Sequence, residues 1–582
     1  LMEFWPEVVR GYDELTERLT MLDQSGQLAT WLAEFASCQV RLVLRDTVIY
    51  SELGTMLWHP ASLHNEPTAR QRAATLLTRH ANNSGAPDDP KVINAEIEDL
   101  LVGDVPFYSV NLGTGLVIGP GDITVDSRGD LVEAALQQWR SLPPGLDREV
   151  IESAVASAYQ DDRDHSEAAR LAPTAVTTEA LDHRRRAAAA AIVRSLVEHA
   201  IDGADGTVSW ISPVIGMNGL GIQPLVLDMY GGLPGVAVLL TAYRREVAAG
   251  RADPVAGVDD LDARVLRSLI IMDDRAHEVG QEHSNARPDP PGGYIGAGSR
   301  VWSWLLLTRL GAIPLADGLR RAAAVAALIP EAVEADEAHE VLGGAAGAIV
   351  PLLRLAELTG DPRWQQEAVR IGDRLANLAR PAPTGVRWPG ARSADGIGGF
   401  AHGALGIAWA LARLADSTGQ ERFAELAEAG LPFQDSFYDR SAGGWQDLRK
   451  EPGTYSNNWC YGSDGIAVVA SDLPPDRFPY RHELLSRAAA ATWAGSFGST
   501  HTGAWEAMDR AFAAGAAPSD VTREALDARV VSSLTEFGPH WAVSSRMFRP
   551  GLMAGAGGIA YQLLRMHRGS ELPSLLLPDP AA

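Results

Sequence analysis

The hydrophobic positions in the last two thirds of the chain repeat at intervals. Each copy has two small residues three positions apart, followed by apolar residues at i, i+3, i+4 and i+7, the spacing of one helical face. In the clearest copy, Gly403 and Gly406 precede a stripe made of Ile407, Ala410, Leu411 and Leu414. The other copies begin at Gly232, Gly296, Gly344, Gly462, His501 and Gly555. The pattern predicts seven helical hairpins, each entered through a small-residue turn.

Glycine in these turns is expected to provide positive φ and to let neighbouring elements approach closely. Hairpins that bury one face against their neighbours either stack as an open solenoid or close into a ring. Only a ring gathers the polar residues of the turns, which are Asp228, His402, Cys460, Tyr461 and His501. We therefore predict a mainly α fold whose C-terminal part is an α/α toroid of seven helical hairpins, with a site at its centre.

The first part of the chain follows another pattern. Helical periodicity near residues 4–35 and 68–80 flanks Val40–Tyr50, a β-rich alternation. A second β-prone stretch, residues 116–125, is interrupted by Gly119-Pro120-Gly121, as a hairpin would be. The sequence therefore predicts a smaller mixed α+β segment ahead of the repeats.

Length and composition indicate where the domains divide. A chain of 582 residues is too long for one hydrophobic core. A polar stretch that begins at Asp161 has linker composition. We expect a first domain over residues 1–172, a linker over 173–184 and the repeat domain over 185–582.

Charge and cysteine content limit the binding partners and the cellular compartment that we expect. A net charge of −24 suits neither nucleic acid nor an anionic membrane. The cysteines, Cys38 and Cys460, exclude a disulfide framework and fit a reducing compartment. With no apolar run of membrane-spanning length and no signal-peptide pattern, we expect a cytoplasmic protein. The chain opens at Leu1 directly in a helical pattern, which indicates either a piece of a larger protein or a processed N-terminus.

Several stretches resemble a known family. Gly399–Gly406, Asn458–Gly462 and Gly551–Tyr561 resemble the signature turns of the lanthionine synthetase C-like cyclases. The first third resembles the last part of the dehydratase domain of class II lanthipeptide synthetases. The stretches that carry this second resemblance are Arg41–Tyr50, His59–Pro60 and Glu96–Phe107. Together the two resemblances cover nearly the whole chain, in the family's order.

The resemblance implies an enzyme of lanthipeptide biosynthesis. In that family the dehydratase phosphorylates Ser and Thr of a precursor peptide with ATP and eliminates the phosphate. The cyclase then adds Cys thiols to the resulting alkenes and forms (methyl)lanthionine thioether rings. The implied partner is a precursor peptide with its leader, and the oligomeric state stays open. The family's ATP-binding elements lie upstream of Leu1, so ATP and Mg²⁺ are expected only with that missing part.

The family's elimination residues map onto Arg41 and Thr47. A guanidinium binds a phosphate leaving group through two parallel hydrogen bonds. On a strand, residues six apart lie on one face, because side chains alternate with period two. Arg45 has the same parity and is the alternative phosphate binder. The simpler interpretation is an edge-strand arginine with a threonine chosen for β propensity.

The resemblance also implies a zinc site, because the family's cyclase holds Zn²⁺ with three protein ligands and leaves one position for the substrate thiol. Cys460 and His501 match the first and third ligands. The second falls on Thr500, whose neutral hydroxyl is a poor zinc ligand. Two ligands hold zinc weakly unless another residue, such as His540, completes the site. Without the metal, Cys460 is an ordinary buried thiol.

Three further residues match polar positions of the family's central site. His402 is suited to donate a proton to the enolate that thiol attack forms. Asp228 is placed to orient His402 or the substrate, and Tyr461 to hydrogen-bond the enolate. The alternatives are a hydrogen-bonded core histidine and an aspartate that only caps its turn.

Two other classes of function stay open. The substitution at Thr500 favours a degenerate cyclase domain that binds peptide as a scaffold without zinc chemistry. An α/α-toroid glycosidase would need paired carboxylates across the central cavity. The turns offer only Asp228 and Asp464 as acidic residues, so this interpretation is the weaker one.

Overall fold

The computed structural model describes residues 4–581 except 85, 126, 143–144, 159–172, 204, 217–218, 283–287, 392, 496–500, 540–547 and 554. The contacts between residues divide the chain into two compact units, Glu3–Arg148 and Glu149–Ala582. This division lies ahead of the linker expected over 173–184, and the domain boundaries inferred from the sequence stay a prediction. Among the described residues, no helix is both long enough and apolar enough to cross a membrane.

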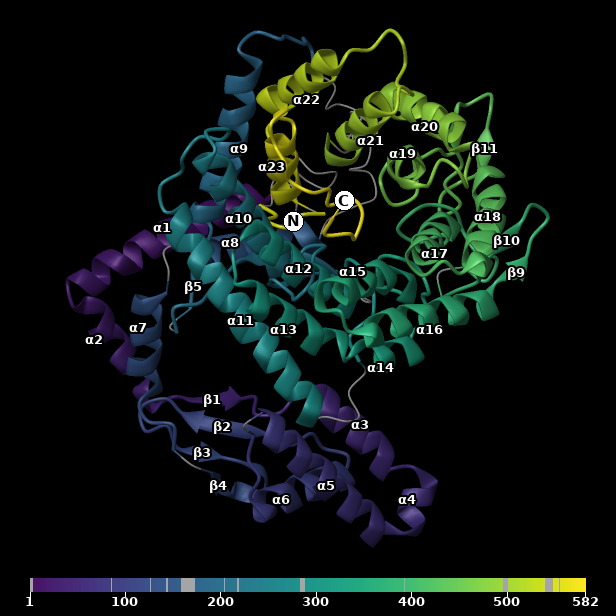
Figure 1. Cartoon of the computed structure of the whole chain (residues 1–582). Coiled ribbons are helices and arrows are strands. Elements are labelled where there is room, and N and C mark those ends of the chain that lie inside the picture. Colours follow the sequence, from purple (N-terminus) through teal and green to yellow (C-terminus); the bar gives the residue numbers. More distant parts are fainter. Residues whose placement is uncertain are drawn as a thin grey trace. The chain divides into compact units, whose positions relative to one another are not determined.

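The first unit combines an antiparallel sheet with helices (Figure 1). The strands follow one another across the sheet in chain order: β1 (Gln39–Leu42), β2 (Tyr108–Asn111), β3 (Val117–Ile118) and β4 (Thr124–Val125). The helices are α1 (Trp5–Gln24), α2 (Gln27–Ala33), α3 (Thr47–Leu57), α4 (Pro60–His64), α5 (Glu66–Ser84), α6 (Pro90–Leu101), α7 (Leu131–Ser141) and, across the division, α8 (Leu146–Ala158). The mixed α+β segment and the hairpin around Gly119-Pro120-Gly121 are confirmed.

The expected strand over Val40–Tyr50 is wrong in its second half. β1 ends at Leu42, and Thr47 is the first residue of α3. Arg41 and Thr47 therefore do not lie on one face of a strand. The apolar residues of this stretch also fit a helix, because the buried positions continue at i, i+3 and i+7. These positions are Tyr50, Leu53 and Leu57.

A buried ion pair joins the elements of the first unit. Arg45 Nε lies 2.8 Å from Glu96 Oε1, and both side chains are fully buried. The same oxygen accepts hydrogen bonds from the hydroxyls of Tyr50 and Tyr108, at 2.7 and 2.6 Å. Arg45 Nη1 donates to the Leu77 carbonyl at 3.0 Å. Arg45, the alternative phosphate binder, is therefore engaged inside the unit.

In the second unit, seven helical hairpins close into a ring (Figure 1). The inner helices are α10 (Leu233–Ala248), α12 (Ala297–Leu310), α15 (Ile349–Thr359), α17 (Ala404–Thr418), α19 (Ser463–Asp472), α21 (His501–Ala513) and α23 (Ala556–Arg565). Their outer partners are α11 (Val258–Glu282), α13 (Leu315–Ala326), α16 (Pro362–Leu378), α18 (Glu421–Asp435), α20 (Arg481–Gly495), α22 (Arg523–Phe537) and α9 (Leu181–Glu198). Each inner helix contacts the next, and α23 contacts α10. The predicted α/α toroid is thereby confirmed.

Short elements occupy the connections between these helices. They are the helices α14 (Ile329–Glu334) and η6 (Ala345–Ala348) and the paired strands β5 (Ile201–Asp202) with β6 (Val208–Ser209), β7 (Ile211–Gly216) with β8 (Gly219–Pro224), β9 (Arg380–Pro381) with β10 (Val386–Arg387), and β11 (Tyr438–Asp439) with β12 (Gly444–Trp445).

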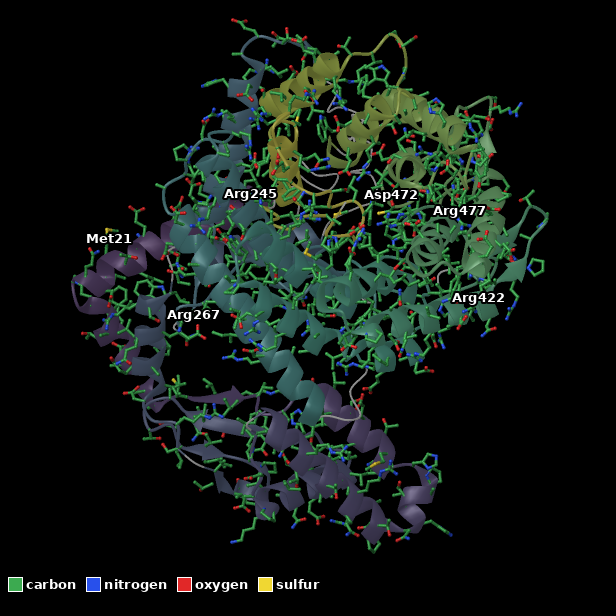
Figure 2. The ribbon with its side chains drawn as sticks, viewed as in Figure 1. Met21, Arg245, Arg267, Arg422, Asp472 and Arg477 are labelled. Carbon is green, nitrogen blue, oxygen red and sulfur yellow. The ribbon has the colours of Figure 1, made fainter. Side chains whose placement is uncertain are left out.

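Inner and outer helices differ in how much of their surface they bury. α17 is buried at every position from Ala404 to Ala412, so the one-face stripe expected for these helices is too narrow. The outer layer covers one side of an inner helix and the neighbouring hairpins cover the others. Charged side chains, among them Arg422 and Arg477, lie around the outer helices (Figure 2), where Arg477 pairs with Glu421 at 2.8 Å.

The glycines that begin the inner helices are required by close backbone approach. Gly232, Gly403, Gly462 and Gly555 have φ between −99° and −159°, so positive φ is wrong for these four. A Cβ on Gly403 would lie 2.2 Å from the carbonyl oxygen of its own turn, and the other three meet similar obstacles. Among the described residues that begin inner helices, Gly296 alone has positive φ, at +92°.

The segment after α23 ties several hairpins together. The Asp579 carboxylate accepts hydrogen bonds from Arg354 of α15, at 2.9 and 3.0 Å, and from Arg413 of α17, at 2.7 Å. The indole N–H of Trp459, in the turn before α19, donates to the Leu576 carbonyl at 3.0 Å. These bonds link elements far apart in the sequence and hold the last residues against the ring.

Candidate functional site

Backbone hydrogen bonds join the first five inward turns in succession and the last turn to the first. The Tyr230 N–H donates to the Tyr294 carbonyl at 3.1 Å, and the Tyr294 N–H donates to the Leu342 carbonyl at 3.0 Å. The Leu342 N–H donates in turn to Ala401, and the Ala401 N–H to Cys460, both at 3.0 Å. The Met553 N–H donates to the Tyr230 carbonyl at 2.8 Å and so joins the last turn to the first. The turns that carry Asp228, His402, Cys460 and Tyr461 are thereby held edge to edge.

Three turns carry a polar side chain at the same position of the repeat. Asp228, Glu340 and Asn458 each lie four residues before the glycine that begins an inner helical segment. An oxygen of each side chain accepts a hydrogen bond from the backbone N–H three residues on, at 2.9, 3.0 and 3.0 Å respectively. Asp228 therefore caps its turn in the same way as Glu340 and Asn458 cap theirs.

His402 lies between a carboxylate and an aromatic ring. Its Nδ1 is 3.3 Å from Glu340 Oε2, and only 8% of the His402 side chain and 3% of that of Glu340 are exposed. The distance suits an ion pair, but the angle is not that of a hydrogen bond. The Tyr461 ring stacks on the imidazole at 4.9 Å, with 26° between the planes. Glu340, which the sequence analysis did not single out, is thus the acidic neighbour of His402.

A guanidinium also lies against the ring of Tyr461. Arg449 Cζ lies 3.4 Å from the centre of the Tyr461 ring. Asp447 holds Arg449 with two hydrogen bonds, at 2.9 and 2.6 Å, and also accepts the Ser456 hydroxyl at 2.6 Å. Burial acts to raise the pKa of Asp447, but these hydrogen bonds outweigh it and lower the pKa. Glu340, His402, Tyr461 and Arg449 therefore form a continuous stack.

Cys460 lies partly buried beside this stack. The Arg449 guanidinium lies within electrostatic range of the Cys460 thiol, as do the phenols of Tyr230 and Tyr294. Burial raises the pKa of both phenols well above the usual range, so both remain protonated donors. The Arg449 cation and the two phenols are thus the described groups in the electrostatic surroundings of the sulfur.

Asp228 lies near Tyr230 rather than against His402. Burial raises the pKa of its carboxyl to about 6, and hydrogen bonds from the backbone of Tyr230, Gly231 and Gly232 limit the increase. No bond or ion pair between Asp228 and His402 is found among the described residues. The role of Asp228 in orienting His402 stays a prediction.

The zinc ligands can be placed only in part. Thr500 and His540 lie outside the described residues, and of His501 only the backbone, at the first position of α21, is described. In the part of the chain that the structure describes, no group of three or more His, Cys, Asp or Glu side chains is arranged to hold a metal ion. Cys460 is the one predicted ligand whose surroundings are described.

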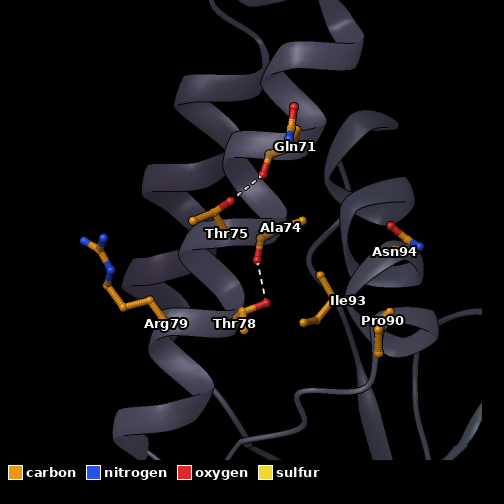
Figure 3. A pocket seen from close by; sticks show the side chains of 8 residues that line it. All are labelled: Gln71, Ala74, Thr75, Thr78, Arg79, Pro90, Ile93 and Asn94. Atoms are coloured by element: carbon orange, nitrogen blue, oxygen red, sulfur yellow. Dashed lines mark hydrogen bonds between the residues drawn. The ribbon is translucent and has the colours of Figure 1, made fainter.

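In the first unit, Arg41 and Thr47 are both exposed. Arg41 lies on β1, the strand at the edge of the sheet, opposite Ser109. A hollow of about 580 Å³ lies between α5 and α6 (Figure 3). Thr75, Thr78, Arg79 and other residues of these two helices line it, and neither Arg41 nor Thr47 does.

Two known families match the two parts of the chain. Residues 223–493 match the family described as lanthionine synthetase C-like protein, and residues 1–111 match a domain of unknown function, DUF4135. These two matches, in this order, confirm the resemblance found in the sequence. A search of curated proteins finds no match to this chain.

Solved structures similar to this chain share little sequence identity with it. Nisin cyclase shares 15% identity over 59% of this chain and 89% of its own length, with a TM-score of 0.43. An unsaturated glucuronyl hydrolase from Bacillus sp. GL1 shares 14% identity over 61% of this chain and 96% of its own, with a TM-score of 0.31. A possible GH105 member from Salmonella enterica shares 12% over 63% and 95%, with a TM-score of 0.30. These likenesses are too weak to support an inference about chemistry.

Proposed function

The chain carries a lanthionine synthetase C-like domain, and from this premise we propose that the ring adds cysteine thiols of a precursor peptide to its dehydrated Ser and Thr residues, forming thioether rings. The observation that carries this proposal is the stack of Glu340, His402, Tyr461 and Arg449 beside Cys460. The support for these roles is that an imidazole, a phenol and a guanidinium lie in contact, on turns that backbone hydrogen bonds hold together.

The stack can perform the addition in two steps. The substrate sulfur bonds to the β-carbon of the dehydrated residue, and the π electrons move onto the neighbouring carbonyl as an enolate. The Tyr461 hydroxyl donates a hydrogen bond to the enolate oxygen, and the Arg449 cation over the ring strengthens that donor. His402 then protonates the α-carbon, and the proton released by the substrate thiol restores His402. Glu340 stabilises the charged imidazole.

Zinc is proposed only on the strength of the resemblance. Cys460 and His501 would hold it, and when bound it would supply a Lewis acid that keeps the substrate thiol ionised near neutral pH. Because a third ligand is missing at Thr500, we propose weak binding. Arg449, whose guanidinium lies within electrostatic range of Cys460, is proposed to favour negative charge on a substrate sulfur bound there.

The test is the cyclisation of a synthetic dehydrated peptide by His402→Asn. We expect the rate to fall at least about 100-fold, the range lost with a general acid, as counted by peptide thiols that still react with iodoacetamide. His482→Asn, which changes a histidine at the start of the outer helix α20, is the control. An unchanged rate for His402→Asn would show that the ring does not use this histidine.

We further propose that the first unit eliminates phosphate from phosphorylated Ser and Thr, with Arg41 binding the leaving group. The supporting observation is that Arg41 is exposed at a sheet edge and forms no ion pair with the residues that the structure describes. With the ATP-binding part of a family dehydratase supplied as a separate chain, Arg41→Ala should leave a phosphopeptide undehydrated, whereas Arg18→Ala on α1 should not. Equal dehydration by both variants would refute the role of Arg41.

A further inference from the structure

Arg549 is a buried arginine with an open hydrogen-bonding edge. Its side chain lies in the turn before α23, and 9% of the residue is exposed. Neither Nε nor Nη2 has a hydrogen-bond partner among the described residues. These two nitrogens lie on the same edge of the guanidinium and point their N–H groups in parallel, the arrangement that binds two oxygens of one anion.

The position of Arg549 is fixed by the closure of the ring. The last turn lies against the first, because the Met553 N–H donates to the Tyr230 carbonyl at 2.8 Å. The Tyr230 phenol lies within electrostatic range of Arg549 as well as of Cys460 and Tyr461. Arg549 is therefore placed at the same inward turns as the stack around His402, with Tyr230 as their common neighbour.

Burial without a partner is unfavourable for this cation. Its only electrostatic neighbour among the described residues is the Tyr230 phenol, and burial lowers the pKa of Arg549 to about 10. Buried charges in folded proteins are normally paired. A cation that is buried at the inward turns, and that has no anionic partner among the described residues, is thus suited to an anion from outside the chain.

The charges nearby define the class of anion. Asp447 pairs with Arg449 through two hydrogen bonds, whereas no carboxylate among the described residues pairs with Arg549. One positive charge with two parallel donors matches a carboxylate, which has one negative charge and two oxygens. A phosphate dianion carries two negative charges, one more than Arg549 balances. The Asp228 carboxyl, which lies within electrostatic range of Tyr230, would add repulsion when ionised.

We infer that the Nε and Nη2 edge of Arg549 binds a carboxylate of the substrate peptide, and so anchors the peptide at the inward turns beside Cys460. The inference rests on the proposed function for the choice of a peptide as ligand. The carboxylate belongs either to the peptide's C-terminus or to an acidic side chain. Both have the same chemistry, and the experiment separates them.

The test measures equilibrium binding, so that it does not depend on turnover. The probes are fluorescein-labelled synthetic peptides with one dehydroalanine, one serine in place of cysteine, and one glutamate. In the first arm the C-terminal acid is replaced by its amide, and in the second the glutamate is replaced by glutamine. We expect one of the two changes to weaken binding to the unaltered chain at least tenfold. The change that does so identifies the carboxylate that Arg549 binds.

Arg549→Met removes the donors and keeps the volume. With this variant the same change of peptide should alter affinity less than twofold, and Arg549→Lys, which keeps the charge without the fork, should give an intermediate value. Arg422→Met, on the outer helix α18, is the control and should preserve the full difference. If neither arm weakens binding to the unaltered chain, or if Arg549→Met preserves the difference, the inference is wrong.

A second measurement tests the unpaired state itself. Without peptide, Arg549→Met should unfold at the same or a higher temperature than the unaltered chain, because a buried unpaired charge is removed. A lower unfolding temperature would show that Arg549 is a structural partner, and would overturn the inference even if cyclisation is confirmed. Conversely, carboxylate-dependent binding without cyclisation would leave the inference standing and refute the proposed function.

Discussion

The two units of the chain each bury an arginine, and they treat it in opposite ways. In the first unit Arg45 donates from Nε, Nη1 and Nη2 to Glu96, Leu77 and Pro87, and Tyr50 and Tyr108 complete the cluster. In the ring, the Nε and Nη2 atoms of Arg549 have no hydrogen-bond partner among the described residues. A paired buried charge holds elements together, whereas an unpaired one costs stability and indicates binding.

The same contrast extends to other polar groups of the inward turns. His402 Nδ1 and the Tyr294 hydroxyl are buried without a hydrogen bond among the described residues. Since most buried polar atoms in proteins have a partner, these two atoms, on turns that the backbone joins to that of Cys460, are available to a bound ligand. The comparison predicts that substitutions in the first cluster affect folding and that substitutions at the inward turns affect chemistry.

Breaking the paired cluster should have the largest effect. Arg45→Met leaves the Glu96 carboxylate buried without its cation, and we expect a loss of about 3–5 kcal/mol in the free energy of unfolding of the first unit. Hydrogen exchange of the amides in α3 and α6 would measure it. Replacing the exposed Arg72 in the same way is the control. A loss below about 1 kcal/mol would remove the contrast between the two arginines.

Asp228 should make the ring less stable as pH rises. Its folded pKa of about 6 lies above the unfolded value of 3.8, so the folded state binds more protons between these values. Stability therefore falls as pH rises from about 4 to about 6, by at most about 3 kcal/mol. Asp228→Asn should lose this dependence when unfolding by urea is measured at pH 4.5 and pH 7. Identical profiles for both proteins would show that the carboxyl is not buried as described.

Glu340→Gln should slow cyclisation about tenfold, equivalent to about 1.4 kcal/mol, because the imidazolium of His402 loses its counter-charge. Glu340→Asp, which keeps the negative charge in the same turn, should retain more of the rate than Glu340→Gln, a rescue that a purely structural role of the longer side chain would not produce. The exposed Glu337→Gln, three residues earlier, is the matched control. An equal loss of rate in Glu340→Gln and Glu340→Asp would assign Glu340 to the turn alone.

Restoring the missing zinc ligand should have the smallest effect. Thr500→Cys should raise the zinc content measured by mass spectrometry after mild chelation, and with it the cyclisation rate. Thr502→Cys adds a thiol two positions on and serves as the control. If the unaltered chain already retains one zinc ion, another residue completes the site and the weak binding proposed here is refuted.

Sequence alone was sufficient for the ring, because repeat spacing and apolar stripes reflect local geometry. The same local patterns misled at Val40–Tyr50, where β alternation and helical spacing coincide and the helix that begins at Thr47 wins through the packing of α3 on α5 and α6. The expectation of positive φ at Gly232, Gly403, Gly462 and Gly555 was wrong. These positions need glycine because backbone atoms of the folded turn leave no room for a Cβ, and the local sequence does not show those contacts.

The missed site residues lacked a local signal, with one exception. Arg449 and Arg549 look like solvated loop arginines, and only tertiary contacts bring one over Tyr461 and bury the other. Glu340 was accessible to sequence analysis, because it occupies the repeat position of Asp228 and Asn458. Aligning the turns by their polar residues, rather than by their glycines alone, would have found it.

The central claim is that the ring performs thiol addition with proton transfer to carbon. The most direct measurement is the reaction of the chain with a synthetic peptide that contains dehydroalanine and cysteine, carried out in D₂O and followed by mass spectrometry after return to H₂O. We predict one deuteron retained per ring formed, at the α-carbon, together with the loss of one alkylatable thiol. A peptide that keeps its thiol and gains no deuteron, with the chain folded and the peptide bound, would contradict the account.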